Sequence, residues 1–146
     1  MRMSADLHWA VAPRLRATGQ RLTPGRRALL DILARASHPL TIAEILRVGQ
    51  GLALSSAYRN LVVLEQAGVV RKVVTEEDFG RYELAEDLTE HHHHLVCSSC
   101  GIVEDLPTDA RVEGVMREVA ASATELSGFT PKGHRLDMVG LCSNCS

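Results

Sequence analysis

The sequence predicts an α+β fold in which a winged helix-turn-helix domain is followed by a small α/β domain. Three observations favour this architecture. Helical patterns in the first half give way to two strand-like segments, two CxxC pairs bracket the last third, and the two halves carry opposite charge. The expected boundaries are residues 1–84 for the first domain, 85–90 for a hinge and 91–146 for the second domain.

Four helices are expected in the first half of the chain, at 7–17, 24–36, 42–49 and about 55–66. Pro24 suits the first turn of the second helix. The segment Thr41–Glu44 matches a capping box and should start the third helix. Ser55 or Ser56 is expected to cap the fourth helix.

A two-stranded ribbon is expected after the helices, with strands at 69–75 and 81–84 joined by the turn-like segment 76–80. Helices followed by such a ribbon make a winged helix-turn-helix, whose fourth helix would enter the DNA major groove. The wing tip Glu76–Asp78 is acidic and would repel phosphate. The wing is therefore expected either not to insert closely into DNA or to contact it only through its basic base, Arg71–Lys72.

The cysteines form two CxxC pairs, Cys97 with Cys100 and Cys142 with Cys145. Four thiolates at this spacing suit one tetrahedral Zn²⁺ in a closed structural site. A redox dithiol and free buried thiols are the alternatives, but neither explains two identical spacings. The pattern favours structural zinc.

The second half is predicted to be a small α/β domain with strands at 93–97, 102–106 and 134–141 and a helix at 109–124. So short a segment cannot bury much core on its own, so zinc would supply the missing cross-link between its first hairpin and its C-terminal end. Dimerisation through an exposed strand edge or the apolar helix face is a further expectation.

A run of four histidines, His91 to His94, stands directly before the first CxxC pair. On a strand, alternate side chains face opposite sides. His91 and His93 would then point one way, and His92 and His94 the other. Because imidazole suits Zn²⁺, Fe²⁺ and Mn²⁺, this alternation predicts two metal sites. The alternative is a solvated polar run.

Charge is divided unequally between the two halves. Residues 1–75 hold eleven Lys/Arg and four Asp/Glu, whereas residues 76–146 hold five and fourteen. The basic half is suited to a polyanion and the acidic half to cations.

The chain offers no candidate for a membrane span, since no apolar run approaches the roughly 18 residues needed. Its N-terminus lacks the apolar core of a signal peptide, so we expect a cytoplasmic protein and no membrane partner.

The segment from Ser55 to Asn60 is the expected recognition helix, although an ordinary amphipathic helix is the alternative. Arg59 can contact a base edge or a phosphate, and Tyr58 a phosphate or a thymine methyl group. Arg21 belongs to a basic face that is solvated by default, but it could reach the backbone or the minor groove. The full set of predicted DNA contacts is Arg21, Arg26, Ser55, Ser56, Tyr58, Arg59 and Asn60.

Five segments together closely resemble the ferric uptake regulator family, in the right order over nearly the whole chain. They are QRLTPGRR at 20–27, SSAYRNL at 55–61, YEL at 82–84, HHHHLVCSSCG at 91–101 and GLCSNC at 140–145. The resemblance implies a dimeric, metal-responsive bacterial transcription factor, usually a repressor. It also implies an N-terminal winged-helix DNA-binding domain and a C-terminal α/β dimerisation domain.

The resemblance assigns the metal ligands to three sites. The structural zinc site takes Cys97, Cys100, Cys142 and Cys145. The regulatory site at the hinge takes His38, Glu83, His92, His94 and Asp105, with Glu104 as the alternative to Asp105 if the alignment slips. A second site takes His91, His93, His134 and Glu113, the last placed by a one-residue insertion.

These ligands imply a switch. A metal bound at the hinge would fix the relative orientation of the two domains, so that two recognition helices in a homodimer match the half-sites of an operator. The sequence thus predicts a repressor of metal-uptake or metal-homeostasis genes that binds double-stranded operator DNA.

The regulatory metal is expected to be Fe²⁺ or Mn²⁺, because residues 83–90 contain no cysteine and the ligands offer only nitrogen and oxygen. A zinc-uptake regulator and a peroxide-sensing repressor are the alternatives within the family. Peroxide-sensing members usually have aspartate in place of Glu83.

Two alternatives come from other classes, a zinc metalloenzyme and a CxxC thiol oxidoreductase. The sequence has no HExxH motif and no zinc-deaminase pattern. An enzyme would also leave the basic helical half unexplained, and a redox protein would leave one CxxC pair redundant. We therefore expect no catalytic residues.

Overall fold

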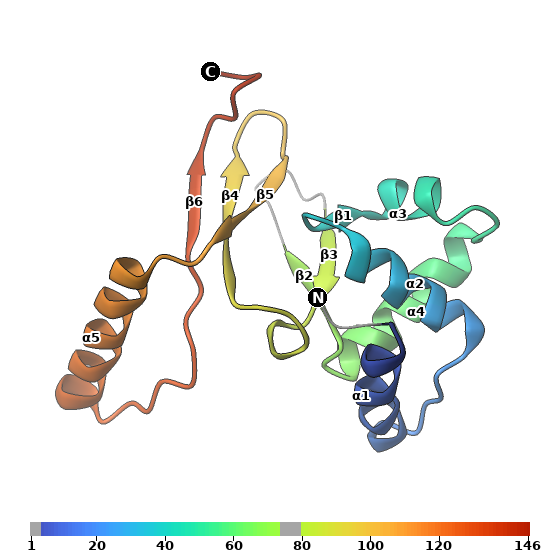
Figure 1. Ribbon diagram of the computed structural model, residues 1–146, viewed down its shortest axis with the longest axis horizontal. Helices are drawn as coiled ribbons and strands as arrows, with labels where there is room; N and C mark the ends of the chain where they lie inside the picture. The colour runs from blue at the N-terminus through green and yellow to red at the C-terminus, as the bar shows by residue number, and fades with distance from the viewer. Residues whose placement is uncertain (1–3, 74–79) are drawn as a thin grey trace.

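The computed structural model describes residues 4–73 and 80–146, which form a helical half and a strand-rich half side by side (Figure 1). The α+β fold predicted from the sequence is confirmed. The expected wing tip, Glu76–Asp78, lies outside the described residues. The expectation that it does not contact DNA therefore stays a prediction.

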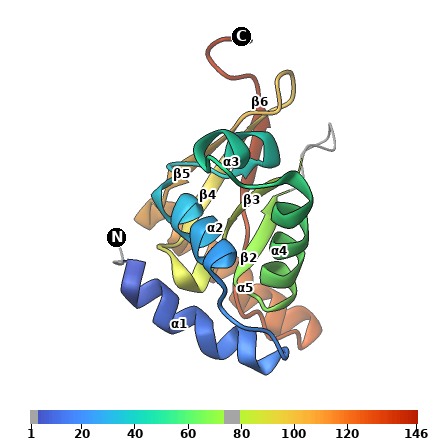
Figure 2. The same ribbon diagram turned by 90° about the vertical axis from the view of Figure 1, so that its right-hand side faces the viewer.

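The first half contains four helices and a three-stranded antiparallel sheet, and it faces the viewer in Figure 2. The helices are α1 (Ser4–Ala17), α2 (Pro24–Arg35), α3 (Ile42–Val48) and α4 (Leu54–Gln66). The strands are β1 (Leu40–Thr41), β2 (Val70–Val73) and β3 (Arg81–Leu84), in the order β1-β3-β2. Four helices and a ribbon in this order form the predicted winged helix.

Local sequence explains most of the helix starts. The Thr41 side chain accepts from the backbone N–H of Glu44, whose carboxylate in turn accepts from the Thr41 N–H, so the predicted capping box is present. The predicted serine cap of α4 is wrong. Ala53 is the N-cap and makes no side-chain hydrogen bond, and its carbonyl accepts from the N–H of Ala57. Ser55 therefore falls inside the first turn of α4, and the helix buries Ala57, Leu61 and Leu64.

A single hydrophobic core supports the winged helix. It is built from leucine and valine side chains of α1, α2, α4, β2 and β3, and it extends to Leu88 in the short 3₁₀ helix η1 (Glu86–Leu88). The segment η1 lies within the predicted hinge. It packs on the first half through Leu88, and the chain continues from it into the second half.

The second half is a three-stranded sheet with one long helix. Its elements are β4 (His92–Cys97), β5 (Val103–Pro107), α5 (Ala110–Ser127) and β6 (Asp137–Gly140). The strand order is β5-β4-β6, with β4 antiparallel to β5 and parallel to β6. The element types match the prediction, but β6 begins at Asp137 and leaves His134 in the preceding loop.

This half has little core of its own. No residue of α5 or β6 is buried in the described chain. In Figure 1, α5 projects away from the rest of the molecule. Its exposed apolar side chains include Val112, Val115 and Val119, and Met138 and Val139 add to them on β6. An exposed apolar surface of this kind marks a protein interface.

Within residues 4–73 and 80–146, no helix is both long enough and apolar enough to cross a bilayer.

Candidate metal centres and DNA-contact surface

The first cluster gathers the four cysteine sulfurs at one edge of the second sheet. Cys97 ends β4, and one residue, Leu141, separates the end of β6 from Cys142. Because β4 and β6 are parallel, their carboxyl ends lie together, and this brings the two CxxC pairs together. The four Sγ atoms lie within 4.8 Å of one another, and all four thiols are free. The arrangement fits one tetrahedral Zn²⁺.

Backbone groups around Cys97 favour its thiolate. The N–H groups of Cys100 and Cys142 donate to its Sγ at 3.5 and 3.4 Å. These bonds, that of Cys100 foremost, lower the pKa of the Cys97 thiol to about 6. A thiolate is the form that binds metal, so the backbone is arranged for a metal ligand.

The second cluster lies where the two halves meet and is called the hinge site below. It brings together donors from β3, β4 and β5 within 4.8 Å of one another: Glu83, His92, His94 and Asp105. Glu83 Oε2 lies 3.1 Å from His92 Nε2 and 3.2 Å from His94 Nε2. Asp105 Oδ1 lies 3.7 and 4.0 Å from the same two nitrogens. Four converging nitrogen and oxygen donors suit a divalent cation.

The outer nitrogen of each hinge imidazole has its own acceptor. His92 Nδ1 is 2.9 Å from the carbonyl oxygen of Glu90, and His94 Nδ1 is 3.1 Å from Asp137 Oδ1. A proton held on Nδ1 leaves the Nε2 lone pair facing the centre of the cluster. This is the arrangement by which proteins orient metal-binding histidines.

The charges of the hinge site are strongly coupled. Burial alone would raise the pKa of Glu83, but hydrogen bonds from His92 and His94 hold it well below its usual range. The bond to Glu83 in turn raises the pKa of His92 to about 9. Burial raises the pKa of Asp105. A cation would therefore replace the proton that His92 holds.

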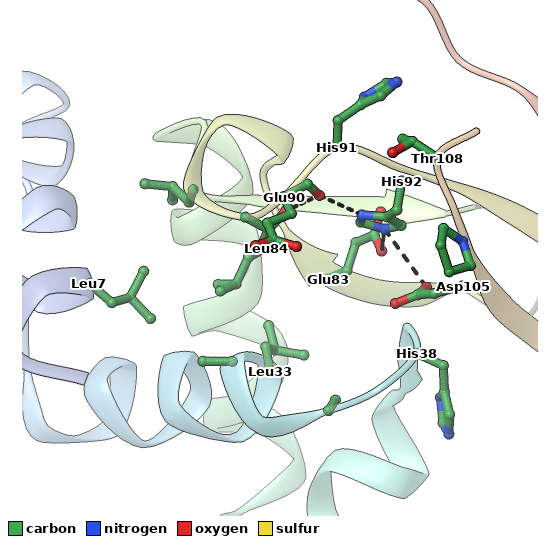
Figure 3. A pocket seen from close by; sticks show the side chains of 15 residues that line it. Leu7, Leu33, His38, Glu83, Leu84, Glu90, His91, His92, Asp105 and Thr108 are labelled. Carbon is green, nitrogen blue, oxygen red and sulfur yellow. Dashed lines mark hydrogen bonds and ion pairs between the residues drawn. The ribbon is translucent and has the colours of Figure 1, made fainter. Parts of the chain in front are cut away.

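His38 is not part of this convergence. Its Nδ1 lies 3.0 Å from the carbonyl oxygen of Pro39, and Figure 3 shows its ring turned away from Glu83 and Asp105. It nevertheless lines the same cavity of about 710 Å³, together with Glu83, His92 and Asp105. The role of His38 as a ligand stays a prediction, and it requires a different side-chain or domain position.

The third cluster is the second site, and it lies within the C-terminal half. His91, His93, Glu113 and His134 offer ligand atoms within 4.8 Å of one another. His93 Nε2 is 2.6 Å from Glu113 Oε1, and His134 Nε2 is 3.2 Å from Glu113 Oε2. His91 Nε2 and His134 Nε2 are 3.1 Å apart. The four histidines of the run thus contribute to two different clusters, His91 and His93 to this one and His92 and His94 to the hinge site. Their roles as metal ligands stay a prediction.

The outer contacts of the second site are less complete. His91 Nδ1 bonds to the Glu86 carboxylate of η1. His93 is only 2% exposed, yet its Nδ1 has no hydrogen-bond partner among the described residues. A metal on Nε2 would leave the remaining proton on an Nδ1 with no acceptor.

Two carboxylates that contact the histidines, Asp137 and Glu86, were not predicted from the sequence. Both lie outside the ligand sets. Asp137 contacts His94 only because β6 pairs with β4 in the register His94↔Asp137. The two residues are 43 positions apart in the sequence, and no local motif predicts their contact. Asp105, in contrast, joins the cluster in place of Glu104 because it pairs with His94 between β4 and β5. That register follows from a local hairpin, which the sequence can predict.

The predicted DNA contacts fall into an exposed set and an engaged set. Ser55, Tyr58 and Arg59 are exposed on α4, and Arg21 is exposed in the loop before α2. Ser56 is half-buried.

Arg26 and Asn60 form the engaged set. The Arg26 Nε donates to Asn60 Oδ1 at 3.1 Å, and its Nη1 donates to the carbonyl oxygen of Arg21. In this arrangement they join α2 to α4 and to the loop that carries Arg21. Contact of either side chain with DNA would require the bond between them to open.

The fold and these sites define a winged-helix protein with metal-binding capacity at and beyond its hinge. The sequence profile described as "Ferric uptake regulator family" matches residues 17–139. The chain is 30% identical over 137 residues to the peroxide operon regulator of Bacillus subtilis (strain 168), covering 90% of this chain and 88% of that protein. It is 28% identical over 142 residues to the ferric uptake regulation protein of the same strain, covering 93% and 92%.

The structure is also similar to the ferric uptake regulator of Helicobacter pylori, with a TM-score of 0.77 and 23% identity over 99% of this chain and 94% of that one. This likeness supports the fold. The chain belongs to the ferric uptake regulator family. It is a transcription regulator and not an enzyme, as the sequence predicted.

Proposed function

We propose that this protein represses metal-uptake or metal-homeostasis genes in the cytoplasm, and that Fe²⁺ or Mn²⁺ at the hinge site switches on its binding to operator DNA. Glu83, His92, His94 and Asp105 are the proposed ligands, and His38 joins them in the DNA-competent arrangement. Zn²⁺ at the four cysteines is a permanent structural ion.

One observation carries this proposal. Glu83 belongs to β3 of the winged helix, whereas the other three donors belong to β4 and β5, and all four lie within 4.8 Å. An ion held by both halves limits their relative motion. It therefore selects, from a looser ensemble, the arrangement that fits the operator.

The exposed apolar side chains of α5 and β6 support a homodimer. Operators with two half-sites are read by two recognition helices at fixed separation. A dimer formed through the C-terminal half would place its two α4 helices at a distance that the hinge controls. Metal binding would thus reach DNA through geometry and without any contact between the ion and DNA.

The choice of metal rests on the ligand chemistry. The hinge donors are imidazole nitrogens and carboxylate oxygens, which suit Fe²⁺ and Mn²⁺ better than a thiolate-containing site would. Similarity does not separate the family's functions, since the peroxide and ferric relatives match at 30% and 28% identity. The titration described next therefore includes results that would indicate zinc sensing or peroxide sensing.

The test is an anaerobic mobility-shift titration of the protein on its own promoter with Fe²⁺, Mn²⁺ and Zn²⁺. His94→Ala and His93→Ala are a matched pair, because both side chains are 2% exposed on neighbouring positions of β4 but belong to different sites. We expect His94→Ala to lose metal-dependent binding and His93→Ala to keep most of it.

Three outcomes would change the proposal. Equal behaviour of the two variants would show that the hinge site does not control DNA binding. Activation by Zn²⁺ alone would indicate a zinc-uptake regulator. Loss of Fe²⁺-dependent binding after peroxide, together with addition of one oxygen atom to His38 or His92 by mass spectrometry, would indicate a peroxide sensor.

A further inference from the structure

Arg71 of β2 contacts the hinge site from the side of the winged helix. It stands directly opposite Glu83 in the β2–β3 pairing. Its Nε donates to Glu83 Oε1, and Glu83 Oε2 faces the two hinge imidazoles at 3.1 and 3.2 Å. The two oxygens of one carboxylate are thus divided between a fixed cation and the metal-binding donors.

The Arg71 bond is not easily given up. Glu83 is 8% exposed, so Oε1 would have few other partners if the guanidinium left. A buried carboxylate oxygen without a donor is costly. Lys72, the next residue on the strand, is exposed. Arg71 and Lys72 are the part of the wing for which the sequence allows a DNA contact, but in the structure Arg71 bonds to Glu83 of the hinge site.

We propose that Arg71 limits the metal affinity of the hinge site and sets its coordination number, because it restrains Glu83 to bind through Oε2 alone. The inference rests on the hinge site proposed above. Arg71 is a positioning residue in this account and does not touch the ion.

Two effects of removing Arg71 oppose each other. Loss of an outer partner usually weakens a metal site by about 10–100-fold. Removal of a positive charge near a divalent ion strengthens it, and Coulomb repulsion over a few ångströms in a half-buried site is the larger effect. Glu83 also stays positioned by β3 and the imidazoles. The net expectation is therefore tighter binding.

Removal of Arg71 leaves Glu83 Oε1 available to the ion, and this should also change which ion binds best. A carboxylate that binds through both oxygens raises the coordination number, which suits Mn²⁺, whereas a small tetrahedral donor set suits Zn²⁺. Removal of Arg71 should accordingly strengthen Mn²⁺ binding more than Zn²⁺ binding.

The test compares Arg71→Met, Arg71→Lys and Lys72→Met in full-length protein with the cysteine zinc in place. All variants carry His134→Ala, so that only the hinge site is titrated. Calorimetry with Mn²⁺ and Zn²⁺ measures affinity, and the visible absorption of bound Co²⁺ reports coordination number. Arg71→Gln serves as a second neutral variant if Arg71→Met does not fold.

We expect Arg71→Met to bind Mn²⁺ about tenfold more tightly and to show the weaker Co²⁺ absorption of a higher coordination number. Arg71→Lys and Lys72→Met should match the protein with only His134→Ala. Affinity and Co²⁺ absorption of Arg71→Met equal to those of Lys72→Met, or weaker binding, would overturn the role of Arg71. Absence of hinge binding in the His134→Ala protein itself would instead refute the proposed function.

Discussion

The hinge site and the second site are built from the same histidine run, yet they differ in what surrounds the imidazoles. At the hinge, both Nδ1 atoms have acceptors, the Glu90 carbonyl and the Asp137 carboxylate. At the second site, His91 has Glu86 but the buried Nδ1 of His93 has no partner in the described chain.

The sites also differ in what they connect. Donors of the hinge site come from both halves, whereas those of the second site all come from the C-terminal half. A pair of sites with similar ligands can therefore have different tasks. The hinge site includes a donor from the winged-helix half, whereas the second site contacts η1 through the bond from His91 to Glu86.

The largest effect is expected from a substitution that abolishes the hinge site and the second site together. Cys142→Ser should release the structural zinc, because three thiolates do not close a tetrahedral site. Structural zinc contributes about 10–16 kcal/mol to small domains, far more than this half can replace by burial. We expect lost zinc by elemental analysis and loss of both histidine sites by calorimetry, while the core of α1–α4 keeps its helical circular dichroism.

A zinc-free Cys142→Ser variant that still binds two further metals would contradict this account, since β4 would then hold its imidazoles without the cysteine cluster. Ser143→Ala lies in the same exposed turn and is the matched control.

The second effect separates the sites by pH. Hydrogen bonding to Glu83 raises the pKa of His92 to about 9, so at pH 7 metal must displace a proton from it. Hinge affinity should therefore rise by about tenfold per pH unit from pH 7 and level off near pH 9. Burial lowers the pKa of His91, so second-site affinity should vary less over that range.

The measurement is Mn²⁺ calorimetry at several pH values, with His134→Ala to isolate the hinge site and His94→Ala to isolate the second. Parallel pH dependence of the two sites would remove the proposed electrostatic difference between them.

The third effect tests the outer contacts. Asp137→Asn weakens the acceptor of His94 Nδ1 and should reduce hinge affinity by about tenfold. Glu86→Gln should do the same to the second site through His91. Each variant is the control for the other in a metal titration. Crossed effects would show that the two sites are not independent.

The smallest expected effect on metal affinity concerns His38. Because four other donors already converge, His38→Ala should change metal affinity of the free protein by less than about tenfold. It should still reduce metal-dependent operator binding, which fluorescence anisotropy with labelled operator can measure. Full retention of that binding would exclude His38 from the switch.

Local patterns predicted the helices, the ribbon and the spacing within each CxxC pair, because each depends on neighbours in sequence. The capping box at Thr41 and the alternation of His91–His94 are of this kind. Long-range pairing was not predictable in the same way. The parallel β4–β6 register that brings Asp137 to His94, and the bond from Arg71 that engages Glu83, appear only in the folded chain.

The start of α4 illustrates a different limit. Serine is a favoured N-cap, and Ser55 and Ser56 stand near the right position. The helix nevertheless begins at Leu54 with Ala53 as its N-cap, two residues before the first of these serines. A favoured capping residue near a helix start therefore does not fix the start by itself.

The central claim is that metal at the hinge and DNA at α4 share one conformational equilibrium. Its most direct test is anaerobic calorimetry of Fe²⁺ or Mn²⁺ binding in the His134→Ala protein, with and without operator. Thermodynamic linkage requires DNA to tighten metal binding by the same factor as metal tightens DNA binding, typically about 5–150-fold. Identical metal affinity with and without operator would contradict the account.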